Sequence, residues 1–456
     1  MFPARDRAAR AFSEVCDQSR GSVSAEKERT MRQVFKKLPV YTGDVSGVCS
    51  ALFELGGMVV MHDPSGCNST YNTHDEIRWY DHDSLIFISG LNEMEAVMGS
   101  DEALIRDITE SARIYSPRFI AIANSPVPYI TGMDFDGISR LIEKETGIPT
   151  FYITTNGMHD YVRGAGLAFL HLAERFAEGL PHNKKEKAWI GRGDQRPLRC
   201  NILGMTPLDF ANPDSLKSLR AKIENAGMEI VSCWAMEDSL DNVRNSASAD
   251  VNLVAASCGL PAARYMYKEF GIPFAAGIPA AGIEELYFEA VRTAAEKREN
   301  LFPFRDRSVL RAAAAGEKEC SAVIEAEYSD QPVCLIGEPV IMTSLAASAE
   351  VRTGVKTCVF GATEGAEIFL GPEDAALAGE EELEKALLSF SQMSHAAHPV
   401  TDKPADIQTS AGVRVVSDPY YRDVFPPGYK QIPLPHLAFS GRILLNDIPD
   451  ILQFKI

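Results

Sequence analysis

Short apolar runs alternate with helical patterns along most of this 456-residue chain. Residues 118–123 are typical of a buried strand, and residues 101–113 and 135–146 on either side of them are typical of helices. The same alternation restarts at residues 200–205 and again at residues 333–337. Strands that alternate with helices usually form parallel sheets covered on both faces. We therefore expect an α/β fold with three doubly wound, Rossmann-like parallel sheets.

The length of the chain agrees with three domains, because one domain takes roughly 150 residues. We expect an N-terminal α/β domain over residues 1–190, a second over 191–329 and a third over 330–456. The first seam falls in the polar and basic stretch 182–199, which is typical of a linker; a phosphate-binding strip is the alternative. In the third domain, a proline-rich extended arm over 425–436 and a short helix around 442–452 should return to the first domain.

The chain is acidic, with 45 basic and 63 acidic residues and a formal net charge of −18. Proteins that bind nucleic acids or anionic membranes take much of their affinity from basic faces, so neither partner is expected. No apolar run is long enough to cross a bilayer, and the basic start of the chain lacks the apolar core of a signal peptide. We therefore expect a cytoplasmic protein.

The common catalytic signatures are missing from the sequence. There is no GxxxxGK[ST] motif, so the chain itself is not a P-loop ATPase. No predicted strand leads into GxGxxG, and neither HExxH nor GxSxG occurs. Whatever chemistry the chain supports must depend on a less common arrangement of residues.

The densest group of chemically capable residues follows the apolar run 58–61. A turn over residues 63–66 leads directly to Cys67, at the start of a helix or polar loop. A thiol at a strand-to-helix junction meets free backbone N–H groups and the positive helix end, which favour its thiolate. A thiolate serves as a nucleophile, a metal ligand or an iron–sulfur ligand. A buried structural cysteine in a tight turn is the alternative.

Further candidates lie close to Cys67 in the sequence. Cys49 is in a short predicted helix, and it would approach Cys67 if the helix and the following strand fold back on each other. His62 precedes the turn and His74 follows Cys67, so both are candidates for proton delivery. The alternatives are a half-buried, hydrogen-bonded histidine for His62 and a polar surface loop for His74. The nine cysteines contain no CxxC, so a disulfide framework is not expected.

These residues resemble a known family. Residues 62–67, with the sequence His-Asp-Pro-Ser-Gly-Cys, resemble the His-Gly-x-x-Gly-Cys element of nitrogenase component 1 subunits. Residues 84–107 and 253–273 resemble other segments of that family, and residues 125–134 resemble its third cluster-binding loop. Members of the family have three doubly wound α/β domains, which is the architecture that the periodicity of this chain predicts.

The resemblance implies roles for particular residues. The family's cluster-binding cysteine matches Cys67, which is then a metal ligand, and Cys49 is a shifted candidate for a second cysteine ligand. The third ligand position matches Ser125, although a serine oxygen is a poor ligand for a soft iron–sulfur site. Cys258 is a candidate to line a cleft between the domains and bind a possible second metallocofactor. Three histidines are candidates for the family's late cofactor-binding histidine: His395, His398 and His436.

The resemblance also implies a function. The chain would be a subunit of a nitrogenase-like oxidoreductase that accepts electrons from a separate, ATP-dependent P-loop iron–sulfur reductase. Electron transfer would pass through an iron–sulfur cluster shared at a subunit interface to a substrate in the interdomain cleft. The partner would be a paralogous or identical component 1 subunit, so the protein would be an oligomer. The alternatives are a scaffold or carrier for metallocofactor assembly, and an α/β binding module without a cluster.

Overall fold

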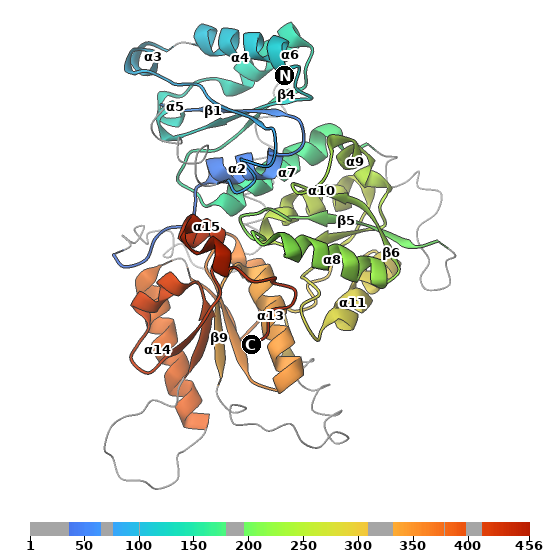
Figure 1. Cartoon of the computed structure of the whole chain (residues 1–456), viewed down its shortest axis with the longest axis vertical. Coiled ribbons are helices and arrows are strands. Elements are labelled where there is room, and N and C mark those ends of the chain that lie inside the picture. The colour runs from blue at the N-terminus through green and yellow to red at the C-terminus, as the bar shows by residue number, and fades with distance from the viewer. Residues whose placement is uncertain are drawn as a thin grey trace.

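The computed structural model describes residues 36–64, 76–99, 101–178, 196–308, 332–377, 379–397 and 413–456. Within these residues the chain forms three parallel sheets, of four, four and five strands. Each sheet is covered by helices and forms a separate layered unit (Figure 1). The predicted α/β fold with three parallel sheets is therefore confirmed. None of the described helices is both long and apolar enough to span a membrane.

The first sheet has its two faces covered by different helices. In spatial order its strands are β2 (Leu85–Ile88), β1 (Met58–His62), β3 (Ile120–Asn124) and β4 (Thr150–Ile153). Alternate β1 side chains such as Met58 and Val60 pack against α4 (Asp101–Tyr115) and α6 (Phe135–Thr146). Val59 and Met61 point to the other face, toward α2 (Asp44–Leu52) and α7 (Tyr161–Phe176). Because both faces are buried, β1 and β3 are continuous apolar runs, which is the pattern that the sequence displays.

The second sheet begins after residue 196. In spatial order its strands are β6 (Met228–Cys233), β5 (Leu198–Leu203), β7 (Val251–Val254) and β8 (Phe274–Ala276). Its helices include α8 (Pro213–Asn225), α9 (Leu240–Asn245), α10 (Leu260–Phe270) and α11 (Glu284–Lys297). The start of α8 has a side-chain cap, because Asn212 accepts a hydrogen bond from the Asp214 N–H and Pro213 occupies the first turn.

The third sheet contains the last strands of the chain. In spatial order they are β11 (Ala375–Ala376), β10 (Thr357–Gly361), β9 (Val333–Gly337), β12 (Arg414–Ser417) and β13 (Lys430–Pro433). Helices α13 (Pro339–Thr353) and α14 (Glu380–Ala397) belong to the same unit. The segment expected as an extended arm thus contains β13, a strand at the edge of the sheet, where proline is tolerated.

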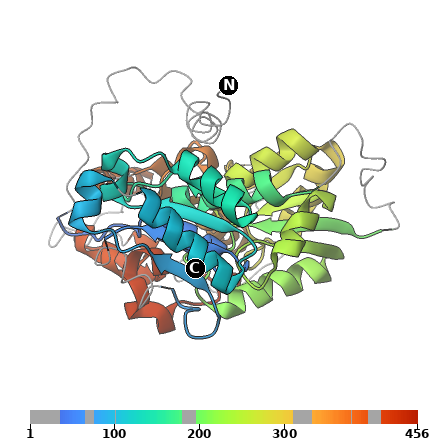
Figure 2. The ribbon, with the colours of Figure 1, turned by 90° about the horizontal axis from the view of Figure 1, so that it is seen from above.

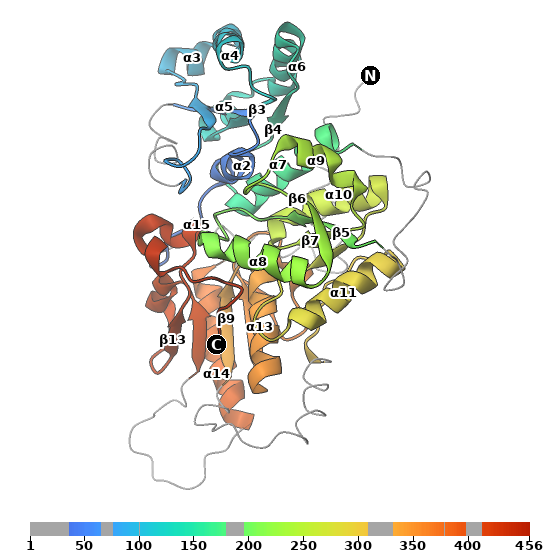
Figure 3. The same ribbon diagram turned by 45° about the vertical axis from the view of Figure 1, so that its right-hand side comes forward.

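The end of the chain connects the third unit to the first. The helical residues are α15 (Leu437–Ser440) and a 3₁₀ segment, Gly441–Asp447, so the helix expected around residues 442–452 starts and stops earlier. It stops there because Pro449 disfavours helical backbone in the residue before it. The Thr42 N–H of the first unit donates to the Ala438 oxygen at 2.8 Å, and Figure 3 shows α15 between these two units.

The three units meet around α7. This helix packs against α2 of the first unit and against α10 of the second. Seen from above, the first unit lies over the other two, with the second unit on the right and the third on the left (Figure 2). The carboxyl ends of the second and third sheets therefore face the region beneath the first unit, where α/β sheets commonly bind ligands.

Candidate functional site

The carboxyl ends of β1 and β3 lie side by side and form the first candidate site. His62 pairs in register with Asn124, and the Ser125 N–H donates to the His62 oxygen at 3.3 Å. Asp63 follows His62 and is fully buried. We call His62, Asp63, Asn124 and Ser125 the first-sheet edge. Ligands of parallel α/β sheets commonly bind at such edges.

His62 is held by its neighbours but keeps one ring nitrogen unused. Its Nδ1 lies 2.8 Å from the Ser89 hydroxyl, which also accepts the Asp63 N–H at 3.2 Å. Its Nε2 is buried and has no hydrogen-bond partner among the described residues. Burial lowers the pKa of His62 to about 4, so the ring is neutral at neutral pH. A neutral imidazole with an unused nitrogen can exchange a proton or bind a metal ion.

Ser125 is the second residue of this edge that could contact a bound group. It is the N-cap residue of α5 (Pro126–Thr131), yet its hydroxyl caps no backbone N–H and has no partner in the described part of the chain. The neighbouring Asn124 side chain lies 2.6 Å from the Tyr152 hydroxyl in either orientation of its amide. The position that matches the family's third cluster ligand therefore presents a buried hydroxyl beside His62.

Two other candidates from the sequence, Cys67 and His74, lie in residues 65–75, outside the described residues. The chain on both sides of that segment is described. On one side it leaves β1 at the first-sheet edge and continues to Pro64. On the other side Glu76 is buried and accepts a 2.7 Å hydrogen bond from Arg78 Nε.

Cys49 lies in α2 and is buried in the apolar core of the first unit. Burial raises the pKa of its thiol, because an apolar environment disfavours the thiolate. The same holds for every cysteine that the structure describes, since all are buried with a raised thiol pKa. They are Cys49, Cys200, Cys233, Cys258, Cys334 and Cys358. The other three cysteines, Cys16, Cys67 and Cys320, lie outside the described residues.

A second group of functional side chains lies where the three units meet. Asp209 follows β5, Cys258 follows β7, Glu338 follows β9 and His436 follows β13, while Tyr161 begins α7. We call these five residues the three-unit junction. The Tyr161 hydroxyl donates to Asp209 Oδ1 at 2.5 Å, and His436 Nε2 lies 3.1 Å from the same oxygen.

The other residues of the junction are also buried. One Glu338 oxygen accepts the Ser257 N–H at 2.8 Å, and the other accepts the Ile341 N–H of α13 at 2.8 Å. Burial, with the nearby charge of Asp209, raises the pKa of Glu338 to about 7. The Cys258 thiol donates to the Gly204 oxygen at 3.7 Å. The remaining cavity is about 20 Å³, which is room for about one water molecule.

Most of the junction was not predicted from the sequence. Cys258 and, as one of three histidines, His436 were candidates, but Tyr161, Asp209 and Glu338 were not. Glu338 directly follows an apolar strand. Ligands of parallel sheets commonly bind at that position, so the sequence could have identified Glu338 as a candidate. Of the other two histidines, His398 lies outside the described residues and His395 lies in α14, where its side chain is not described.

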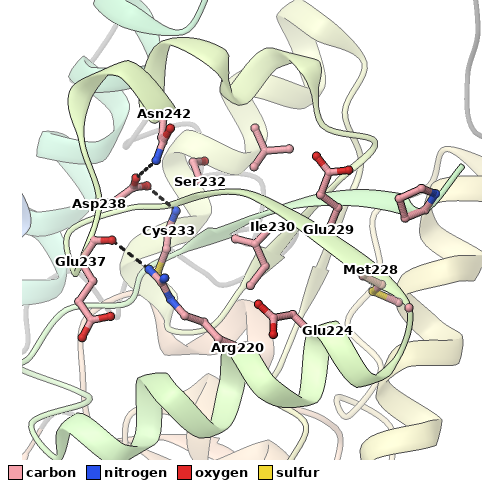
Figure 4. A pocket seen from close by; sticks show the side chains of 13 residues that line it. Arg220, Glu224, Met228, Glu229, Ile230, Ser232, Cys233, Glu237, Asp238 and Asn242 are labelled. Atoms are coloured by element: carbon pink, nitrogen blue, oxygen red, sulfur yellow. Dashed lines mark hydrogen bonds between the residues drawn. The ribbon is translucent and has the colours of Figure 1, made fainter.

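A separate hollow of about 580 Å³ lies at the open edge of β6. Figure 4 shows Arg220, from α8, reaching into it beside acidic side chains. The Arg220 guanidinium donates to the backbone oxygen of Glu237 at 3.0 Å, and the Asp238 carboxylate accepts the Cys233 N–H. Among its lining residues the only thiol is the buried Cys233, so this hollow offers no ligand set for a metal cluster. No group of three or more metal-binding side chains occurs anywhere in the described ranges.

Comparison with known proteins gives a family match over most of the chain. The family described as "Nitrogenase component 1 type Oxidoreductase" matches residues 46–396. One subunit of the light-independent protochlorophyllide reductase from Synechococcus sp. (strain JA-3-3Ab) is 23% identical over 231 residues, covering 50% of this chain and 45% of the relative. The nitrogenase iron-molybdenum cofactor biosynthesis protein NifE of Methanosarcina barkeri is 24% identical, covering 46% of this chain and 44% of the relative.

A third relative, the nitrogenase molybdenum-iron protein alpha chain of Azospirillum brasilense, is 24% identical and covers 47% of this chain and 45% of the relative. The chain thus spans less than half the length of these curated relatives. A solved structure, "Nitrogenase Cp1 at pH 5", superposes with a TM-score of 0.51 at 15% identity, covering 91% of this chain and 88% of that chain. At that identity the superposition supports the fold alone.

Proposed function

The chain belongs to the nitrogenase component 1 type oxidoreductase family, and we propose that it is a subunit of a nitrogenase-like oxidoreductase. As the family resemblance implies, electrons would arrive from a separate ATP-hydrolysing iron–sulfur reductase, which is consistent with the absence of a P-loop from this sequence. The observation that carries the proposal is the first-sheet edge. There two buried polar atoms, His62 Nε2 and Ser125 Oγ, have no partner among the described residues, and Cys67 follows this edge five positions after His62 in the sequence.

The residues present fit only part of an iron–sulfur site. The described thiols are all buried, Cys49 lies in the apolar core of the first unit, and no group of three or more metal-binding side chains occurs in the described ranges. We assign Cys67 as the thiolate that this chain supplies, because it matches the cluster-binding cysteine of the family's motif, and we leave Cys49 out of the proposed ligand set. The remaining ligands would come from a paralogous or identical partner subunit. When bound, such a cluster supplies electrons one at a time.

The other residues of the first-sheet edge have supporting roles in this proposal. His62 would hold or release one proton at Nε2, since reduction of a substrate consumes protons as well as electrons. Ser125 would donate its hydroxyl hydrogen to the bound group or provide an oxygen ligand. His74 is a second candidate for proton delivery. It rests on its place in the sequence, seven positions after Cys67.

The alternative is a scaffold on which a metallocofactor is assembled. The relatives include NifE, which is named as a cofactor biosynthesis protein, at an identity equal to that of the nitrogenase alpha chain. The two functions differ in what stays bound. A scaffold releases its cofactor to an acceptor protein, whereas an oxidoreductase subunit keeps its cluster through repeated turnover.

The proposal is tested by anaerobic purification of the chain together with its partner subunit. Iron and acid-labile sulfide would be measured per chain, with EPR of the reduced protein, in the wild type, Cys67→Ala and Cys49→Ala. We expect Cys67→Ala to lose the iron and Cys49→Ala, the buried control, to keep it. An iron-free wild-type complex, or equal iron in the wild type and in folded Cys67→Ala, contradicts the proposal.

A further inference from the structure

The three-unit junction stands where the family resemblance would place a second metallocofactor or a substrate. The ends of β5, β7, β9 and β13 bring side chains of two sheets to this point. We infer that the chain closes this junction with its own hydrogen-bonded side chains and binds no metallocofactor there. The inference deepens the proposed function, because it leaves the first-sheet edge as the site of redox chemistry in this chain.

A single carboxylate connects all three units at the junction. Asp209, in the second unit, accepts the Tyr161 hydroxyl from the start of α7 at 2.5 Å. It also pairs with His436 of the third unit, whose Nε2 lies 3.1 Å away. Asp209 and Tyr161 are buried, and the His436 side chain is only 11% exposed. Hydrogen bonds to a buried carboxylate are strong, so this arrangement stabilises the closed junction.

Glu338 forms a second connection between the second and third units. Its two oxygens accept N–H groups from Ser257, in the loop after β7, and from Ile341, in the first turn of α13. Each Glu338 oxygen thus accepts a backbone N–H, which fixes the orientation of the carboxylate between the two units. A buried backbone donor left unpaired is destabilising, which opposes movement of this carboxylate.

The end of the chain covers the junction from outside. The Ile451 N–H donates to the Ser215 hydroxyl at 3.1 Å, and Asn212 Nδ2 donates to the Ile448 oxygen at 2.9 Å. The Ser218 hydroxyl donates to Asp450 at 2.5 Å. These bonds attach residues 448–451 along α8, and Ile448, Pro449 and Ile451 line the remaining cavity.

Cys258 and His436, the two residues here that the family resemblance suggests as ligands, lie in a closely packed place. Cys258 is fully buried with its thiol on the Gly204 oxygen. His436 uses Nε2 for Asp209, and its buried Nδ1 has no partner among the described residues. The cavity of about 20 Å³ takes about one water molecule, far less than a cluster of several iron and sulfur atoms requires. A metallocofactor of several atoms would therefore fit here only after displacement of the terminal segment that lines the cavity. A scaffold or carrier function that uses this junction is therefore disfavoured.

The test compares metal content and stability in the full chain, purified anaerobically with its partner. Metals are counted by plasma mass spectrometry in the wild type, Cys258→Ser, His436→Gln and His436→Ala. Glutamine can donate a hydrogen bond in place of Nε2 but is a poor ligand for soft metals, so His436→Gln should retain both stability and metal content. His436→Ala should lower the melting temperature by several degrees, because it leaves Asp209 without that partner, and should still leave the metal content unchanged.

The inference is overturned if folded Cys258→Ser or His436→Gln loses metal that the wild type holds. It is also overturned if crystals of the complex show anomalous scattering from a metal at the junction. Loss of iron in Cys67→Ala tests the proposed function separately, since Cys67 is not part of the junction. An iron-containing wild type with unchanged metal in both junction variants supports the inference.

Discussion

At the residue scale, the buried polar groups of this chain fall into two kinds. Arg78 is completely bonded: it pairs with Glu76 and Glu54 and donates to the Ser50 and Ala235 oxygens. His62 and Ser125 instead each keep a buried atom without a partner in the described part of the chain. Buried polar groups are normally paired, so these two atoms are candidates for a partner outside the described residues or for a bound group.

Removal of the Arg78 side chain tests the first kind. Arg78→Ala leaves two largely buried carboxylates, Glu54 and Glu76, without their cation, so we expect a loss of about 3–5 kcal/mol of unfolding free energy. Urea denaturation at pH 7 measures this loss. Arg106→Ala, which removes an exposed pair with Asp107, is the matched control and should change stability by less than about 0.5 kcal/mol. Equal effects of the two variants would contradict the assigned network.

The pH dependence of stability tests the neutral state of His62. Its pKa is about 4 in the folded protein against an ordinary 6.5, because burial disfavours the imidazolium. The unfolded chain therefore binds more protons between these values, and the stability from His62 is complete above pH 6.5 and is lost as the pH falls toward 4. Between pH 7 and pH 5 we expect the unfolding free energy of the wild type to fall by about 2 kcal/mol more than that of His62→Asn.

Urea denaturation series at pH 7 and pH 5 measure that difference. Asparagine keeps a polar atom near the Ser89 hydroxyl, so the variant should still fold. If His62→Asn shows the same pH dependence as the wild type, His62 does not titrate as a buried neutral histidine.

The sequence could identify single candidates at this scale but not their arrangement. His62 and Ser125 were predicted separately, and they meet only because β1 and β3 pair in register. Tyr161, Asp209, Glu338 and His436 are far apart in the sequence, and three units must pack before they approach one another. Periodicity predicts elements, whereas contacts between units depend on packing that no local pattern encodes.

At the scale of elements, prediction succeeded where burial on both faces gave unbroken apolar runs. The expected strand 58–61 is β1, and the expected strand 228–233 is β6. The arm over residues 425–436 was less well predicted, because Pro433 argues against a central strand while an edge strand accepts it. The contact between α2 and α7 depends on glycines instead, because only a residue without a Cβ lets the two helix backbones approach this closely.

Alanine at Gly164 should separate α2 from α7. A Cβ at this position would overlap the Asp44 backbone oxygen, so the two backbones would have to move apart. We expect Gly164→Ala to cost at least about 1–3 kcal/mol, the usual range for overpacking. Gly166→Ala in the same helix is the comparison, because its Cβ would lie 3.2 Å from the Pro261 side chain, a tight contact but not an overlap with backbone. Thermal unfolding should show a clearly larger loss for Gly164→Ala than for Gly166→Ala.

At the scale of the whole molecule, the units are joined by buried titratable groups at their boundaries. Asp160, at the start of α7, accepts the Glu364 N–H of the third unit, and burial with the charge of Glu364 raises the pKa of Asp160 to about 7. Glu338 has a pKa of about 7 from burial beside Asp209. Contacts between the units should therefore respond to pH more strongly than contacts within the sheets, whose cores are apolar.

Glu338→Gln tests this dependence. The folded protein binds more protons than the unfolded chain between pH 4.5, the ordinary value of Glu338, and about 7. The stability from this group is therefore complete below pH 4.5 and falls as the pH rises through 7, by about 3 kcal/mol in total. Asp209, His436 and Tyr161 lie in the same junction and remain in the variant, so the difference in slope reports Glu338 together with its interaction with Asp209.

The measurement is urea denaturation of the wild type and Glu338→Gln at several pH values from 4.5 to 8. Glutamine keeps only one carbonyl acceptor for the Ser257 and Ile341 N–H groups, so the variant should be less stable at low pH. Its stability should then decline less with rising pH, and the gap to the wild type should narrow. Glu381→Gln, on the exposed side of α14, should keep the wild-type slope. Parallel curves for the wild type and Glu338→Gln would mean that the junction holds Glu338 as an ordinary ionised carboxylate.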